Sequence, residues 1–170
     1  GVFSLVIGDA TVGKAMAEDK RVALVSATGS TRMGKKVGEA VGARLGRALL
    51  ELGGNNAIVV TENADMEMAI RATVFGAVGT CGQRCTSTRR LIVHDSLYDT
   101  MKEKLASAYK QSRIGNPLDE NNHMGPLIDH DAVNSYLHSI EEIKKAGGTM
   151  LVEGGVLEGE GYESGCYVKP

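Results

Sequence analysis

The sequence predicts an α/β fold built around parallel strands. Short apolar strands alternate with amphipathic helices along the 170 residues. The turns between them are rich in glycine, which supplies 22 of the 170 residues, about 13% against a usual ~7%. Hydrophobic residues make up 42% and charged residues 24%, which is ordinary for a globular domain. The alternation and the glycine-rich turns together favour strands joined by helical crossovers.

The first part of the chain predicts two strands and two helices. We expect a strand at Phe3–Ile7 and a helix at Thr11–Glu18, with Ala and Met on its buried side. A second buried strand, Val22–Val25, runs into the turn Ser26–Thr31, and a helix follows through Val41. Strand, helix, strand, glycine-rich turn and helix in this order are typical of a parallel sheet.

The middle part predicts two further strands and a buried helix. The strands lie at Arg47–Leu52 and Ala57–Val60, on either side of a pair of glycines. Asp65 can cap the helix that follows, because a carboxylate accepts hydrogen bonds from the unpaired N–H groups of a first turn. The polar segment Gly79–Thr88 is expected to be irregular. Six residues spaced by three and four mark the helix: Met66, Ala69, Ile70, Thr73, Val74 and Ala77.

The last part predicts a strand at Arg90–Val93 and two amphipathic helices. Ser96, with Asp99 three residues on, resembles a capping box for the first helix. A strand is expected at Thr149–Val152, and the Gly- and Glu-rich stretch Gly154–Gly165 is expected to be a disordered loop. Helically spaced residues mark the two helices: Leu97, Met101, Leu105 and Tyr109 in the first, and Val133, Tyr136, Leu137, Ile140 and Ile143 in the second.

Charge and hydropathy exclude several functional classes. The 19 Lys and Arg against 21 Asp and Glu leave a net charge of −2, without the basic excess of a nucleic-acid-binding protein. No apolar run approaches the roughly 18 residues of a membrane helix. Cys81, Cys85 and Cys166 form no disulfide framework, and the histidines show no metal-ligand spacing. We therefore expect no nucleic acid, membrane or metal partner, and a cytoplasmic location, or the mitochondrial matrix in a eukaryote.

The segment Gly29–Lys36 follows a strand and opens a helix. Backbone N–H groups and the helix dipole favour an anion at such a turn. Three interpretations stay open. It could be a P-loop, although Lys36 stands where Ser or Thr should hold Mg²⁺. It could be a tight turn without a ligand, or the phosphate site of a dinucleotide.

Glu51 and Cys85 are the candidate catalytic residues. Two glycines follow Glu51, so the backbone there can lie close to a ligand. Cys85 lies in a glycine-rich bend before a strand, and a thiolate is a good nucleophile. A carboxylate that acts as a base would complete a two-step mechanism. Each residue also has a plain structural interpretation, as a solvated carboxylate and as a small buried hydrophobe.

Three ordered motifs resemble the aldehyde dehydrogenase superfamily. Ser26–Gly34 is similar to its Gly-Ser-Thr-x-x-Gly cofactor turn, Glu51–Gly54 to its Glu-Leu-Gly-Gly motif, and Gly82–Cys85 to its Gly-Gln-x-Cys motif. Cys85 follows Glu51 by 34 positions, which fits the family. Asn55-Asn56, where Lys is usual, and the run from Cys85 to Arg90 resemble its antiquitin branch, the α-aminoadipic semialdehyde (piperideine-6-carboxylate) dehydrogenases.

The resemblance implies an aldehyde dehydrogenase-like fold. Residues 1–51 would be part of a Rossmann-type NAD-binding domain, and residues 52–170 part of the α/β catalytic domain. The chain would be an internal fragment, inactive alone, of a protein that forms homodimers or homotetramers. Two alternatives are a P-loop-like nucleotide-binding module and a catalytically silent fragment of the same fold.

The resemblance also implies NAD-dependent oxidation of an aldehyde, with α-aminoadipic semialdehyde as the expected substrate. Cys85 would form a thiohemiacetal and then a thioester, which water activated by Glu51 would hydrolyse. Thr86 would contact the substrate. The residues implied to bind the cofactor are Gly13, Gly29, Ser30, Glu51 and Leu52.

Overall fold

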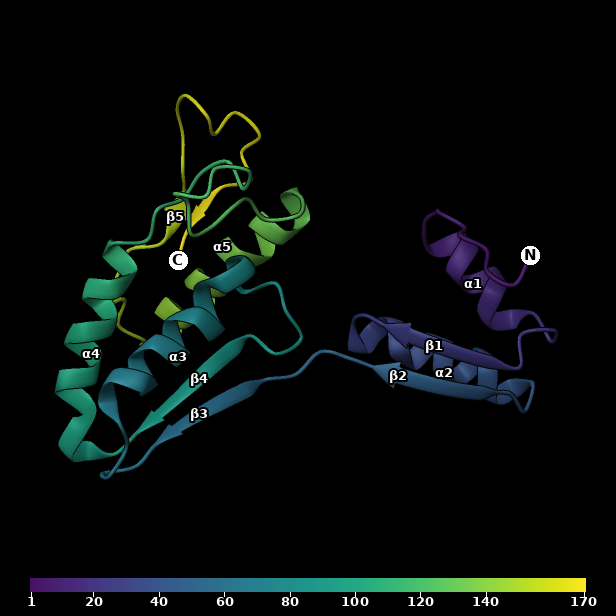
Figure 1. Cartoon of the computed structure of the whole chain (residues 1–170), viewed down its shortest axis with the longest axis horizontal. Coiled ribbons are helices and arrows are strands. Elements are labelled where there is room, and N and C mark those ends of the chain that lie inside the picture. Colours follow the sequence, from purple (N-terminus) through teal and green to yellow (C-terminus); the bar gives the residue numbers. More distant parts are fainter. The chain divides into compact units, whose positions relative to one another are not determined.

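A computed structural model describes residues 1–170, and they form two compact units, Gly1–Gly54 and Asn55–Pro170 (Figure 1). Each unit mixes helices with a pair of parallel strands. The predicted α/β class with parallel strands is therefore confirmed. The assignment of residues 1–51 to a cofactor domain and 52–170 to a catalytic domain stays a prediction.

The first unit contains one parallel strand pair and two helices. Strands β1 and β2 pair in parallel along their whole length, so that Thr28 lies opposite Glu51 at the carboxyl edge. Helix α2 connects the two strands and packs against them, and α1 packs against α2 (Figure 1). In chain order the elements are α1 (Ala10–Glu18), β1 (Leu24–Thr28), α2 (Thr31–Ala43) and β2 (Arg47–Glu51).

The predicted strand at Phe3–Ile7 was wrong. These residues precede α1 without pairing to any strand, and the side chains of Phe3 and Ile7 are 94% and 86% exposed. An apolar run becomes a strand only where a neighbouring strand accepts and donates its backbone hydrogen bonds. The helix behind it begins as expected, with Asp9 as the cap: its carboxylate accepts a 2.9 Å hydrogen bond from the Thr11 N–H.

The second unit is built around another parallel pair, β3 and β4, joined by α3 (Figure 1). Helix α3 packs against β4, and α4 packs against α3. The short strands β5 and β6 form an antiparallel pair near the end of the chain. The elements are β3 (Asn56–Val60), α3 (Met66–Val78), the 3-10 helix η1 (Gly79–Gly82), β4 (Thr88–Val93), α4 (Asp95–Lys110), α5 (His130–Lys145), β5 (Gly155–Val156) and β6 (Val168–Lys169).

A small core holds the last third of the second unit together. Leu127, Val133, Cys166 and Val168 are buried against one another. Tyr136 on α5 connects this core to the β5–β6 pair, because its hydroxyl donates to the Lys169 carbonyl (2.7 Å) and accepts from the Gly155 N–H (2.8 Å). The helix therefore fixes both short strands.

Two further predictions in this region were wrong. Thr149–Val152 forms no strand, and β5 begins instead at Gly155, where β6 offers a partner. The stretch Gly154–Gly165, expected to be disordered, is tied down: the Tyr162 hydroxyl donates to the Ile114 carbonyl (2.9 Å), and its ring lies edge-on to Tyr167. Contacts between distant segments, which local composition does not reveal, decide both outcomes.

The start of α4 also differs from the expected capping box. The helix begins at Asp95, and its cap is His94, whose Nδ1 accepts from the Ser96 N–H (3.3 Å). The Ser96 hydroxyl lies 2.9 Å from the same Nδ1. An imidazole nitrogen can thus take the place of the usual Ser or Asp oxygen.

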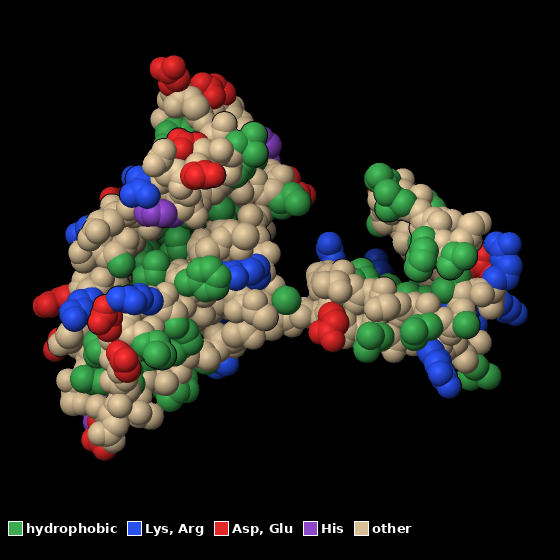
Figure 2. All heavy atoms as spheres, viewed as in Figure 1, with side chains coloured by type: hydrophobic (Ala, Val, Ile, Leu, Met, Phe, Trp, Pro, Cys, Tyr) green, Lys and Arg blue, Asp and Glu red, His purple; other side chains and the backbone are tan.

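The surface carries charges of both signs. Figure 2 shows Lys and Arg side chains interspersed with Asp and Glu over much of this face, and Asp and Glu alone at its upper end. None of the helices combines the length and apolarity required to traverse a lipid bilayer. Several large apolar side chains lie at the surface, among them Leu45, Phe75 and Leu118.

Candidate active site

The glycine turn lies at the carboxyl edge of the β1–β2 pair. Strand β1 ends at Thr28, Gly29 and Ser30 form the turn, and α2 begins at Thr31. The Gly29 N–H donates to the Glu51 carbonyl (3.0 Å), so the turn is joined to the end of β2. The Ser30 Oγ caps α2 by accepting from the Met33 N–H (3.1 Å). This cap uses the Met33 N–H, and it leaves the N–H groups of Thr31 and Arg32 and the Ser30 hydroxyl proton available to an anion at this edge.

Leu52 lies against the same helix. Gly34 in α2 is buried, and a Cβ at that position would lie 2.5 Å from both Leu52 Cδ atoms. The absence of a side chain at Gly34 is what lets Leu52 approach. Four of the five residues predicted to bind the cofactor, Gly29, Ser30, Glu51 and Leu52, therefore gather at one edge.

Gly13 does not share this arrangement. It lies within α1, its N–H bonded to the Asp9 carbonyl, and no atom lies within 4 Å of where its Cβ would be. The packing of this unit therefore does not require glycine at Gly13. A close approach of the cofactor to Gly13 stays a prediction.

The backbone excludes the P-loop alternative. A P-loop needs the residues between its two glycines to form an open loop whose N–H groups surround a phosphate. Here the residues from Thr31 to Lys36 already belong to α2. The turn between β1 and α2 is only Gly29 and Ser30, which fits one anionic group at a helix N-terminus.

Cys85 lies on a tight turn in the second unit. The Ser87 N–H donates to the Arg84 carbonyl (3.1 Å), and the Arg84 N–H donates to the Ser87 Oγ (3.1 Å). Cys85 and Thr86 occupy the two central positions of this turn and are exposed, whereas Ser87 is buried. The turn therefore presents the thiol outward while its closing serine stays inside.

The residues before this turn adopt unusual backbone angles. Thr80, Cys81 and Gly82 are all left-handed, with φ of +52°, +54° and +67°. This region is costly for a β-branched residue such as Thr, and residues in such conformations cluster at functional sites. The consecutive left-handed residues reverse the chain between the end of α3 and the cysteine turn.

A second group of contacts holds this loop to the segment before α5. Gln83 uses both ends of its amide: Nε2 donates to the Pro126 carbonyl (3.4 Å) and Oε1 accepts from the Ile128 N–H (2.9 Å). The Cys81 thiol donates to the Gly125 carbonyl (2.9 Å). Burial raises the pKa of the Cys81 thiol, which keeps it protonated at neutral pH. Cys81 is therefore a structural thiol.

Asn56 is the residue that the sequence did not single out for a role. Its Nδ2 donates to the Cys85 carbonyl (2.7 Å) and to the Ser87 carbonyl (3.0 Å). In the sequence, Asn56 is only one of the residues by which the chain resembles one branch of a family. The signal was present, since an amide opens an otherwise apolar strand, but its partners lie about 30 residues away in the chain.

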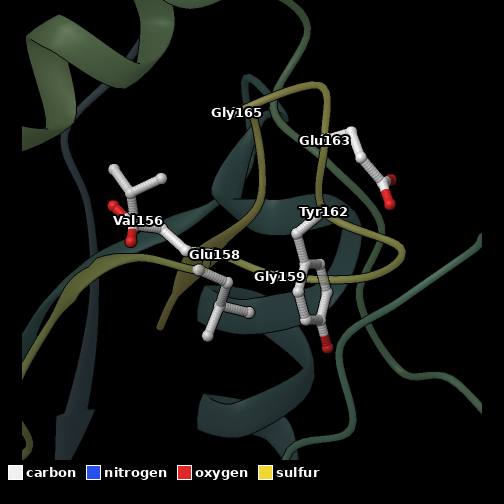
Figure 3. Close-up of a pocket in the computed structure, with 7 residues that line it drawn as sticks. Val156, Glu158, Gly159, Tyr162, Glu163 and Gly165 are labelled. Carbon is white, nitrogen blue, oxygen red and sulfur yellow. The ribbon is translucent and has the colours of Figure 1, made fainter.

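A surface pocket lies elsewhere, along the loop after β5 (Figure 3). Val156 and Tyr162 flank it on opposite sides, and Glu158 and Glu163 are its acidic residues. It contains no cysteine, and neither Cys85 nor Glu51 lines it. The structure also holds no group of three or more His, Cys, Asp or Glu side chains that could bind a metal ion.

The sequence profile of the aldehyde dehydrogenase family matches residues 1–170. The chain belongs to the aldehyde dehydrogenase family. Glu51 and Cys85 lie in different units of this family member.

Two relatives of this aldehyde dehydrogenase chain come from one branch of the family. A Caenorhabditis elegans homolog of aldehyde dehydrogenase family 7 member A1 is 57% identical over 160 residues, covering 93% of the chain. The bovine α-aminoadipic semialdehyde dehydrogenase is 48% identical over 169 residues, or 99% of the chain. The chain spans 30% and 31% of these two relatives' lengths, about a third. The expected resemblance to this branch is confirmed.

Solved structures agree with the family. PnpE in complex with nicotinamide adenine dinucleotide matches with a TM-score of 0.88 at 34% identity, over 93% of this chain and 32% of that one. A Staphylococcus aureus betaine aldehyde dehydrogenase double mutant in complex with NAD⁺ matches with a TM-score of 0.91 at 29% identity, over 97% of this chain and 34% of that one.

Proposed function

We propose that the protein to which this chain belongs is an NAD-dependent aldehyde dehydrogenase that oxidises α-aminoadipic semialdehyde to the carboxylate. The observation that carries the proposal is the exposed Cys85 on its closed turn, in a chain that belongs to this family. The net reaction converts an aldehyde, NAD⁺ and water into a carboxylate, NADH and two protons.

The edge formed by Gly29, Ser30, Glu51 and Leu52 fits a dinucleotide. The capped N-terminus of α2 offers N–H groups and a positive dipole end to a pyrophosphate, and the Ser30 hydroxyl can donate to it. Leu52, packed on Gly34, offers an apolar surface beside the end of β2. When bound, NAD supplies the oxidising chemistry by accepting a hydride from the substrate carbon.

Cys85 is the proposed nucleophile. As a thiolate, its Sγ forms a bond to the aldehyde carbon, and the carbonyl oxygen becomes an oxyanion in a thiohemiacetal. The backbone N–H of Cys85 is the oxyanion donor that we assign within this chain. Loss of a hydride from the same carbon restores the C=O bond and leaves a thioester on Sγ. Thr86, exposed next to Cys85, is the proposed contact with the substrate.

Glu51 is the proposed base for the second half of the reaction. Its side chain is exposed at the end of β2, where two glycines follow. The carboxylate takes a proton from water, whose oxygen attacks the thioester carbon. The C–S bond then breaks, which regenerates the thiolate of Cys85, and the carboxylic acid formed loses its proton to give the carboxylate product. Gly13 is proposed to let the backbone approach the cofactor.

We propose α-aminoadipic semialdehyde as the substrate because similar proteins are named for it. The bovine and mouse proteins named α-aminoadipic semialdehyde dehydrogenase are 48% and 47% identical over 169 residues. We also propose that the full-length protein is a homodimer or homotetramer in the cytoplasm or the mitochondrial matrix. Light scattering and cell fractionation test these two statements.

The experiment is a steady-state assay of the full-length protein with NAD⁺ and three aldehydes: α-aminoadipic semialdehyde, acetaldehyde and betaine aldehyde. We expect the highest kcat/KM for the semialdehyde and no activity in Cys85→Ala. Activity that survives in Cys85→Ala would refute the assignment of the nucleophile. An intact, folded wild-type protein inactive on all three aldehydes would favour the catalytically silent alternative.

A further inference from the structure

Asn56 makes two hydrogen bonds to the cysteine turn, and no step proposed above uses it. It opens β3, and its amide Nδ2 donates to the carbonyls of Cys85 (2.7 Å) and Ser87 (3.0 Å). We propose that Asn56 is a positioning residue that fixes the backbone of Cys85 for attack on the aldehyde. This inference rests on the proposed function, because it assigns Asn56 a part in the step that Cys85 performs.

The strand pairing explains how the side chain reaches the turn. Asn56 pairs with Thr88, but the next residue, Ala57, pairs with Arg90, so the register shifts by one residue at this point. Such an irregularity re-aims side chains and is common next to active sites. It directs the amide of a strand residue towards the turn that precedes the neighbouring strand.

The amide group matches its two partners. An Asn NH₂ carries two hydrogens, so one nitrogen can donate to two carbonyls at once. The accepting residues, Cys85 and Ser87, lie two positions apart on the same turn. Asn56 is half-buried and Ser87 is 2% exposed, which shields the second bond from water. Both bonds together fix the turn against β3.

The reaction depends on this fixation. The proposed attack needs the Sγ of Cys85 in line with the aldehyde carbon and the Cys85 N–H on the forming oxyanion at the same time. The turn's own hydrogen bonds join Arg84 to Ser87 and leave the central Cys85 peptide held only by Asn56. A misplacement of about 1 Å costs on the order of 100-fold in rate. Alkylation of the thiol by a small reagent has no such requirement.

The test compares three variants of the full-length protein. Asn56→Ala removes both donors, and Asn56→Gln keeps them but displaces them by one methylene. Asn55→Ala is the control, since the Asn55 side chain is exposed and only its backbone carbonyl is used, by Arg90. The measurements are the rate of the NADH burst on rapid mixing with α-aminoadipic semialdehyde, the KM for NAD⁺, and the rate of Cys85 alkylation by iodoacetamide.

We expect the burst rate to fall roughly 10- to 100-fold in Asn56→Ala and to a smaller extent in Asn56→Gln. The KM for NAD⁺ and the alkylation rate should stay within about threefold of wild type, and Asn55→Ala should match wild type throughout. If Asn56→Ala does not fold, the same split in Asn56→Gln supports the proposal.

Three results would overturn the inference. The burst could be unchanged in folded Asn56→Ala. The burst rate, NAD⁺ affinity and melting temperature could all decline together in both variants, which is the mark of a purely structural role. A folded wild-type protein that forms no NADH from the aldehyde would overturn the proposed function and this inference with it, and is recognised before any variant is measured.

Discussion

Replacing Ser87 by alanine tests the geometry of the cysteine turn. Ser87 is 2% exposed, and its Oγ accepts the Arg84 N–H at 3.1 Å. Serine and alanine are close in size, so the substitution leaves almost no cavity. What it does leave is the Arg84 N–H, in a half-buried position, without its acceptor. A buried donor that loses its partner costs about 1–3 kcal/mol.

The assay is hydrogen exchange at the backbone N–H of position 87, which keeps its own bond to the Arg84 carbonyl in the variant. This N–H exchanges when the turn opens, so a loss of about 1–3 kcal/mol speeds its exchange by roughly 5- to 150-fold. Ser4→Ala is the control, because Ser4 is an exposed serine outside any helix or strand. Exchange at position 87 within about twofold of the control would refute the turn as described.

Three further predictions concern the titratable groups. Glu51→Gln should retain one rapid NADH burst and lose steady-state turnover, because the substitution removes the base for hydrolysis but leaves Cys85 in place. Full steady-state turnover in this variant would contradict the role of Glu51. Iodoacetamide at neutral pH should label the exposed Cys85 before Cys81. Labelling of Cys81 should rise as the pH increases, because burial raises the pKa of the Cys81 thiol. Peptide mass spectrometry at pH 7 and pH 9 measures both, and it would show Cys81 labelled first if the cysteine turn were folded inward. Hydrogen bonds from Arg21 lower the pKa of Asp19 from 3.8 to about 2. Their contribution to stability is therefore present above pH 3.8 and is lost as the pH falls towards about 2. Arg21→Ala should raise the NMR titration midpoint of Asp19 towards 3.8, and an unchanged midpoint would rule out the pairing.

The fold was predictable where local patterns decide it. The helical spacing from Met66 to Ala77 and the cap at Asp65 match α3, whose Asp65 carboxylate accepts from the Met68 N–H (3.0 Å). The alternation of strands and helices also predicted parallel strands, which both units contain, although it did not predict which strands pair. The helix and its cap depend on neighbours within one or two helical turns, which the sequence records directly.

The elements that failed depend on distant partners. Phe3–Ile7 has the composition of a strand but no strand beside it, and Thr149–Val152 gives way to Gly155, which finds a partner in β6. Local composition is the same with or without a pairing partner. Only the tertiary structure shows whether such a segment has a partner strand.

The candidate site also contains residues that the sequence reveals and residues that only the fold reveals. Cys85, Glu51 and the glycine turn are recognisable because their chemistry is written in residue types and spacing. The residues that brace the cysteine turn are not, since Asn56, Gln83 and Ser87 are ordinary polar residues until the fold places them. Their partners lie up to 45 positions away in the chain.

Trapping the acyl-enzyme in Glu51→Gln tests the central claim most directly. The full-length variant is mixed with NAD⁺ and α-aminoadipic semialdehyde, quenched in acid, digested and examined by mass spectrometry. The account predicts a thioester adduct on the peptide that contains Cys85, in an amount equal to the NADH formed in the burst. An adduct on a different residue, or NADH formed with no adduct on Cys85, would contradict it.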